Sequence, residues 1–346
     1  MKKAISVIIP IHNQELELSK CLASVCKQTL VFPYEIICVL DQSNNISYDI
    51  VNSYKYLLGD KIKIIECNFQ DAGLTRNLGI REATGDYIFF LDSDDYISED
   101  CLEKLYHAAT TTNADLIVAN YGISKRNSKV INEWNMSKFY LPGTYTKEEV
   151  LLKYLKDFRI RGFVWNKLYK RELIVDSGIK FLPSKLTIED RPFLLEYIIN
   201  SNKIHFIKDT TYVYIQHRSS FVKSTNKLIF MQKYINCDFA CKVILIKHHL
   251  FSQEDFEKSL LFRRTALFHD AKKLDNIHHY KNKIFKQVEK QLEILSGNNL
   301  FVYNAPWEST ILCLNYNIKY DNLPKSKGIF ELRKFLWKEF FGFYNN

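Results

Sequence analysis

Short hydrophobic segments alternate with amphipathic segments along the first third of the chain. Segments rich in β-branched residues predict buried strands at 4–10, 34–40, 61–67, 86–91 and 114–122. The segments between them, 15–28, 46–58, 72–83 and 98–110, place apolar residues at helical spacing. Strands that alternate with helices predict an α/β fold with a mostly parallel sheet covered on both faces.

The pattern changes twice further along the chain. Residues 145–220 are mixed, with a strand-rich stretch, "KIHFIKDTTYVYIQHR", near the end. From about 225 onward the apolar residues follow helical spacing almost throughout. This change predicts an α/β domain at 1–220, followed by a helical C-terminal region at 221–346.

Composition narrows the class of protein. With 346 residues and 47% hydrophobic content, the chain can bury a sizeable core. Eight cysteines without a CxxC pair indicate reduced thiols, as in a cytoplasmic protein, and no apolar stretch reaches membrane-spanning length. The net charge of +9 suggests an anionic partner. The motifs with which proteins position nucleic-acid bases are missing, so we expect no nucleic acid.

Aspartates follow the apolar ends of the predicted strands. Asp41 ends one strand, and Asp92 and Asp94 come directly after another, "DYIFFL". In open α/β sheets, ligands bind at the carboxyl ends of strands. Clustered carboxylates stay ionised only beside a cation, and Mg²⁺ or Mn²⁺ is the simplest one. A solvated acidic loop is the alternative without a metal.

Three other carboxylate or nucleotide motifs fit less well. An EF-hand requires glycine at its sixth loop position, where this chain has Ile97. A dinucleotide fold requires GxGxxG after its first strand, and that motif is missing. A phosphatase of the haloacid-dehalogenase type also carries Asp-x-Asp after a strand, but Tyr96 stands where that motif has Thr or Val.

Five stretches in this order and spacing resemble the family-2 inverting glycosyltransferases with a GT-A fold. They are "SVIIPIHN", "EIICVLDQSNN", "GLTRNLGIREATGDYIFFLDSDD", "WNKLYKREL" and "IEDRPF". The fourth adds a likeness to the branch that makes capsule and cell-surface polysaccharide. The resemblance covers about residues 4–220 and implies a Rossmann-like catalytic domain.

The resemblance implies a role for each matching residue on the donor side. Pro10 and His12 would hold the uracil base, and Asp41 would accept a hydrogen bond from uracil N3–H. Arg76 would lie near the base and diphosphate. Ser93 and Arg218 are further expected nucleotide-sugar contacts. Without the resemblance, Arg76 is equally well explained as a surface arginine of a helix, and His12 can be explained as a polar histidine that caps a loop.

The resemblance also implies a metal and a base. Asp94 and Asp92 would bind Mn²⁺ or Mg²⁺, and Asp92 would contact the ribose or a metal-bound water. His217 is a candidate third ligand, although a structural histidine fits that position as well. Asp190 would be the catalytic base, with Glu189 facing the donor sugar or the acceptor. An acidic pair that begins a helix is the alternative reading.

The sequence therefore predicts a cytoplasmic, metal-dependent glycosyltransferase. It would move a hexose or N-acetylhexosamine from a UDP-sugar to a surface-glycan acceptor, which in this family is usually lipid-linked. The phosphatase and a non-catalytic nucleotide- or glycan-binding module are the alternatives. Aromatic and basic residues in the tail at 329–343 suggest peripheral membrane contact, with docking on the protein itself or on another subunit as the other readings.

Overall fold

The computed structural model describes residues 3–13, 17–125, 131–134, 141–156 and 163–216, and isolated residues between 233 and 250. The chain forms two compact units, Met1–Lys185 with Glu189–Asn226, and Leu186–Ile188 with Lys227–Asn346. All the elements named below belong to the first unit. The domain boundary near 220 stays a prediction.

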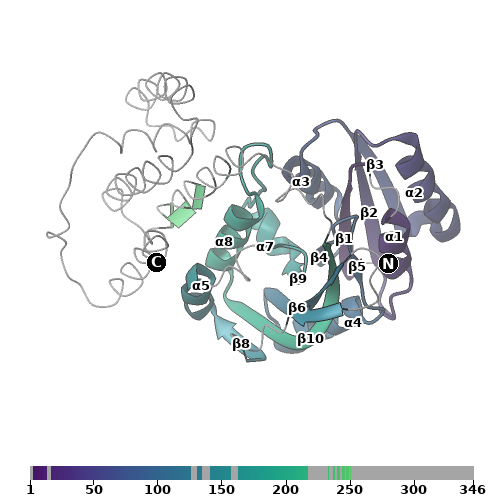
Figure 1. Cartoon of the computed structure of the whole chain (residues 1–346). Helices are drawn as coiled ribbons and strands as arrows, with labels where there is room; N and C mark the ends of the chain where they lie inside the picture. Colours follow the sequence, from purple (N-terminus) through teal and green to yellow (C-terminus); the bar gives the residue numbers. More distant parts are fainter. Residues whose placement is uncertain are drawn as a thin grey trace, which may run out of the picture. The chain divides into compact units, whose positions relative to one another are not determined.

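A sheet forms the centre of the first unit (Figure 1). Within the described residues it has ten strands, in the order β3-β2-β1-β4-β9-β6-β10-β5, with β7 beside β6 and β8 beside β10. The strands are β1 (Ile5–Ile11), β2 (Tyr34–Asp41), β3 (Ile62–Cys67), β4 (Tyr87–Phe90), β5 (Tyr96–Ile97), β6 (Leu116–Lys125), β7 (Ile131–Trp134), β8 (Gly143–Thr146), β9 (Lys167–Lys170) and β10 (Lys203–Gln216). The helices are α1 (Leu18–Cys26), α2 (Asn45–Leu58), the 3-10 turn η1 (Gly59–Lys61), α3 (Ala72–Glu82), α4 (Cys101–Thr112), α5 (Lys147–Lys156), α7 (Arg171–Asp176) and α8 (Asp190–Asn200).

The five strands predicted in the first third are confirmed as β1, β2, β3, β4 and β6. The neighbours β3, β2, β1 and β4 all pair in parallel, and so do β6 and β10. The hydrophobic pattern did not predict β9, a four-residue strand that pairs antiparallel with both β4 and β6. A segment of that length shows too little periodicity to reveal a strand.

The strand order reverses beside β1. The chain steps from β1 to β2 to β3 in one direction, and β4 then pairs on the other side of β1. Right-handed crossovers therefore put α1 and α2 on one face and α3 on the other, where α3 packs on β1 and β2 (Figure 1). Ligands of such folds bind where the strand order reverses, at the carboxyl ends of β1 and β4.

Burial explains why these segments form these elements. Every residue of β2 is buried, and β1 is buried except for the half-buried Pro10, as expected for strands covered on both faces. Asn44 and Asp71 begin α2 and α3 as N-caps, accepting from the N–H groups of Ser47 and Leu74. Within the described part of the chain, no helix has the length and hydrophobicity needed to span a membrane.

Candidate active site

Three loops at the carboxyl ends of β1, β2 and β3 contain a residue with left-handed backbone. Asn13, Gln42 and Gln70 have φ angles of 48°, 48° and 51°. A glutamine in this region is strained, and such strain gathers at functional sites. The side chains of Gln42 and Gln70 hydrogen-bond each other, which ties the second loop to the third.

Asp41 holds the loop after β3. Its Oδ1 accepts from the backbone N–H groups of Phe69 and Gln70, both at 2.7 Å, and its Oδ2 accepts from Asp71 N and Thr75 Oγ1, both at 2.8 Å. Burial alone would raise the pKa of Asp41, but these donors lower it below its ordinary value. A carboxylate offers about four acceptor positions, so uracil N3–H would have to displace one of these donors.

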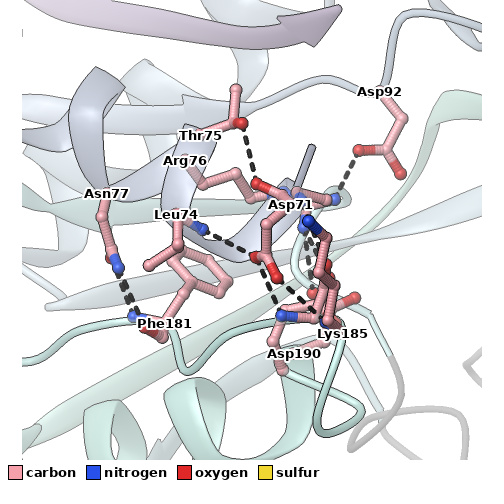
Figure 2. Close-up of polar contacts among 12 residues, drawn as sticks. Asp71, Leu74, Thr75, Arg76, Asn77, Asp92, Phe181, Lys185 and Asp190 are labelled. Atoms are coloured by element: carbon pink, nitrogen blue, oxygen red, sulfur yellow. Dashed lines mark hydrogen bonds and ion pairs between the residues drawn. The ribbon is translucent and has the colours of Figure 1, made fainter. Parts of the chain in front are cut away.

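Arg76 connects the acids that follow β4 with the acids that begin α8. Its Nη2 lies 2.8 Å from Asp92 Oδ1, and its Nη1 lies 2.9 Å from Glu189 Oε1 and 3.7 Å from Asp190 Oδ1 (Figure 2). The Arg76 side chain is only 6% exposed. This burial excludes the alternative that Arg76 is a surface arginine. Its expected place near the base and diphosphate stays a prediction.

Burial sets the protonation of the acidic pair. It raises the pKa of Asp190 to about 8, although the Arg76 guanidinium acts in the opposite direction. Burial likewise raises the pKa of Glu189. Lys167 is a second buried cation, and its pKa falls to about 7 because of burial, an effect that Asp190 opposes. Its Nζ donates to Phe163 O at 2.6 Å and to Asn166 Oδ1 at 2.7 Å.

The loop after β4 gathers three carboxyl groups. Burial and the neighbouring Asp92 raise the pKa of Asp94 to about 6, so ionised carboxylates repel each other here. Asp95 is buried and accepts from Tyr212 Oη at 2.6 Å and Ile215 N at 2.7 Å, so it connects the loop to β10. Tyr212 Oη also accepts from Asp92 N at 3.3 Å, so this tyrosine holds the loop at both ends.

These acids fit a magnesium or manganese ion. Mg²⁺ typically takes one or two protein carboxylates and completes its shell with water and substrate phosphates. Asp92 and Asp94 match that number of carboxylates, and a cation would offset the burial and the repulsion from Asp92 that together raise the pKa of Asp94. Among the residues that the structure describes, no cluster of three or more His, Cys, Asp or Glu side chains forms a metal site.

The remaining expected site residues are partly described by the structure and partly outside it. Pro10 is half-buried near the end of β1, and His12 is exposed with its ring Nδ1 at 2.7 Å from the Asp41 carbonyl oxygen. Ser93 is buried in the acidic loop. His217 and Arg218 lie outside the described residues, as does the tail at 329–343. Each assigned role stays a prediction.

Sequence reasoning missed three polar residues that hold this site together: Asp71, Asn77 and Tyr212. An aspartate directly before a predicted helix is an N-cap signal that points to Asp71. The pairing of Asn77 with Phe181, 104 positions later, left no signal in the local pattern. Trp165 is buried and stacks on Tyr212 with ring centroids 4.3 Å apart.

Acids therefore lie at the carboxyl ends of the strands of a Rossmann-like sheet. Residues 6–174 match the family model described as Glycosyl transferase family 2. EpsH of Bacillus subtilis, named as a glycosyltransferase, is 31% identical over 66% of this chain and 65% of its own length. The poly(ribitol-phosphate) β-N-acetylglucosaminyltransferase TarP of Staphylococcus aureus is 28% identical over 89% of this chain and 90% of its own length.

The fold has a counterpart among solved structures. The crystal structure of S. aureus TarS residues 1–349, in complex with UDP-GlcNAc, superposes with a TM-score of 0.54, at 23% identity, over 73% of this chain and 74% of that chain. Residues 6–174 therefore form a glycosyltransferase family 2 domain with the GT-A fold, and this domain and its relatives make the protein a glycosyltransferase. The family assignment sets aside the phosphatase and the non-catalytic binding module.

Proposed function

We propose that the protein is a metal-dependent, inverting glycosyltransferase. In this proposal it transfers a hexose or N-acetylhexosamine from a UDP-sugar to a hydroxyl group of a surface-glycan acceptor. The observation that carries the proposal is the contact of one buried arginine, Arg76, with Asp92 on the donor side and with the Glu189–Asp190 pair. One guanidinium thus contacts an acid proposed to bind the donor and the acidic pair proposed to act on the acceptor.

The proposed chemistry places the base at Asp190. The acceptor oxygen attacks the anomeric carbon, its proton passes to the Asp190 carboxylate, and the bond from that carbon to the diphosphate breaks. The electron pair of the broken bond leaves with UDP. Attack on the face opposite the leaving group inverts the anomeric configuration. A base works best when its pKa is near the working pH, and burial moves the pKa of Asp190 in that direction.

The donor side is proposed to use the residues that the family motifs match. Asp92 and Asp94 would hold Mn²⁺ or Mg²⁺, which when bound neutralises charge on the leaving diphosphate. Pro10, His12 and Ser93 lie at the carboxyl ends of β1 and β4, where such folds bind nucleotides. Arg218 as a diphosphate contact and His217 as a metal ligand remain proposals for residues outside the described part of the chain.

The relatives guide the choice of donor and acceptor. TarP is named for transfer of N-acetylglucosamine to poly(ribitol phosphate). A Bacillus spizizenii relative, 32% identical over 62% of this chain and 32% of its own length, is named for transfer of glucose to the same polymer. We therefore propose UDP-GlcNAc or UDP-glucose as donor and a polyol-phosphate or related surface glycan as acceptor. A lipid-linked acceptor would place the enzyme on the cytoplasmic face of the membrane, with peripheral contact through the tail.

Donor screening tests this proposal. Purified protein with Mn²⁺ is incubated with UDP-, GDP- and dTDP-sugars, with and without poly(ribitol phosphate), and release of the nucleoside diphosphate is measured. We expect UDP release that EDTA abolishes, a β-linked product by NMR if the donor is an α-linked UDP-sugar, and a rate about 10²–10⁴-fold lower in Asp190→Asn. A full rate in Asp190→Asn would show that another residue is the base. Release from GDP- or dTDP-sugars alone would refute the UDP donor.

A further inference from the structure

A short segment before α8 lies against the first half of α3. Asp71, the N-cap of α3, accepts from Ser184 N at 2.8 Å with Oδ1 and from Lys185 N at 2.9 Å with Oδ2 (Figure 2). The side-chain amide of Asn77 donates to Phe181 O and accepts from Phe181 N, both at 2.8 Å. We call residues 181–185 the strap. Both ends of the strap are therefore held by side chains at the beginning and in the middle of one helix.

Close packing of the two backbones accompanies these hydrogen bonds. A Cβ atom on Gly73 would lie 2.2 Å from the Leu182 carbonyl oxygen, a distance at which the strap would have to shift. Ala72 N also donates to Ser184 Oγ at 3.0 Å. The surface of α3 is thus shaped to receive the strap backbone, as well as to hydrogen-bond it.

The strap is also packed against α8. The Phe181 ring stacks on the Phe193 ring, with centroids 3.9 Å apart and planes 4° from parallel. The Arg76 guanidinium carbon lies 5.5 Å from the Phe181 ring centroid. Phe193 stands on the first turn of α8, three positions after Asp190. Strap, α3 and α8 therefore form one packed unit that includes the acidic pair.

We infer that Asp71 and Asn77 are positioning residues for the base Asp190: by fixing the strap on α3, they set where α8 begins. This inference rests on the proposed role of Asp190. Neither residue touches the reacting atoms, and each acts through Phe181–Lys185 and Phe193. Displacement of a catalytic group by about 1 Å can lower a rate on the order of 10²-fold, so a loosened strap would affect turnover.

Two isosteric substitutions separate this role from helix capping. Asp71→Asn keeps an oxygen for the Leu74 and Ser184 N–H groups, and asparagine is as good an N-cap as aspartate, but its NH₂ group would face Lys185 N–H. Asn77→Asp keeps an acceptor for Phe181 N but turns a second oxygen toward Phe181 O. Asp100→Asn, at the N-terminus of α4 on a 43% exposed side chain, is the matched control.

The experiment measures UDP release from UDP-GlcNAc, UDP affinity by calorimetry, and hydrogen exchange of the strap amides, all with Mn²⁺ on the full chain. For Asp71→Asn and Asn77→Asp we expect kcat to fall about 10- to 100-fold. UDP affinity should stay within about 3-fold, because among the described residues the side chains of Asp71 and Asn77 hydrogen-bond only the strap and the start of α3. Faster exchange at Ser184 and Lys185 should accompany the loss, and Asp100→Asn should match the wild type.

Combination with Asp190→Asn decides between positioning and general damage. If Asp71 and Asn77 act through the base, each substitution should lower the rate of Asp190→Asn by less than about 2-fold, since residues that act as a unit are non-additive. The inference would be overturned if Asp71→Asn or Asn77→Asp lowered the rate by the same factor in the wild-type enzyme and in Asp190→Asn. It would also be overturned if hydrogen exchange of the strap became faster while kcat of the otherwise wild-type enzyme stayed unchanged. A full rate in Asp190→Asn alone would instead refute the proposed base, and the positioning role with it.

Discussion

Replacement of Asp41 by asparagine tests whether this carboxylate holds the loop after β3. The side chain keeps its size and shape but loses its charge and two of its acceptor positions. In the better orientation, the amide oxygen keeps the N–H groups of Phe69 and Gln70, and the NH₂ group faces Asp71 N and Thr75 Oγ1. Thr75 can turn its hydroxyl to accept, because that hydroxyl also reaches the Asp71 carbonyl oxygen at 2.8 Å. The Asp71 N–H group has no such alternative.

The contacts set the expected size of the effect. A buried N–H group left without an acceptor costs about 1–3 kcal/mol, and Asp71 is only 3% exposed. The hydrogen bonds from Phe69 and Gln70 remain but lose the charge of their acceptor, which roughly halves their strength. Asp41→Asn should therefore lower the free energy of unfolding by about 2–4 kcal/mol at pH 7.

The effect should depend on pH in one direction. The pKa of Asp41 is lowered in the folded protein. Its ionised form therefore contributes stability above the ordinary aspartate pKa of about 3.9, and this contribution is lost as the pH falls through the lowered folded value. The difference in stability between wild type and Asp41→Asn should be constant from about pH 5 to pH 8 and shrink in more acidic solution.

Urea unfolding of the full chain at several pH values measures this difference, with an unchanged m-value as the sign that only stability moved. Asp60→Asn is the control, because the Asp60 side chain is fully exposed and should change stability by less than about 0.5 kcal/mol. A loss below about 0.5 kcal/mol in Asp41→Asn would refute the argument that Asp41 holds the loop. Weaker UDP binding at unchanged stability would instead favour the predicted base-reading role.

Three further substitutions test the rest of the site. Arg76→Gln leaves the buried acids without their cation, so it should lower the free energy of unfolding by about 3–5 kcal/mol. Because Arg76 lowers the pKa of Asp190, its loss should also move the acidic limb of the rate–pH profile for UDP release to higher pH, and an unmoved limb would contradict this. The pKa of Asp94 is raised to about 6 in the folded protein, so wild type in EDTA should lose stability as the pH rises from about 4 to 6, and Asp94→Asn should remove this loss. In calorimetry, Asp94→Asn should also abolish any strengthening of UDP binding by Mn²⁺. If Mn²⁺ still strengthens UDP binding to Asp94→Asn, Asp94 is not a ligand. Tyr212→Phe deletes the hydroxyl between Asp92 N and Asp95 and should cost about 1–3 kcal/mol in urea unfolding; an unchanged midpoint would show that the hydroxyl does not hold the loop.

The sequence by itself determined the elements of the first third and the edge of the sheet at which the acids lie. Buried parallel strands leave short continuous apolar runs and their helices leave helical spacing, so the hydrophobic pattern alone was enough to place β1, β2, β3, β4 and β6. The topological rule for ligands in open α/β sheets then brought Asp41, Asp92 and Asp94 to one side.

Only the tertiary structure decided which partners each polar group has. Arg76 meets Glu189 across 113 positions, and Asp71 meets Lys185 across 114, distances over which no local pattern carries information. The strand β9 is equally invisible locally, since its four residues belong to the sheet only because β4 and β6 lie on either side of it. Periodicity reports which face of an element is buried, whereas hydrogen bonds and ion pairs depend on how distant loops pack, and the packed loops give Asp41 and Asp71 their contacts.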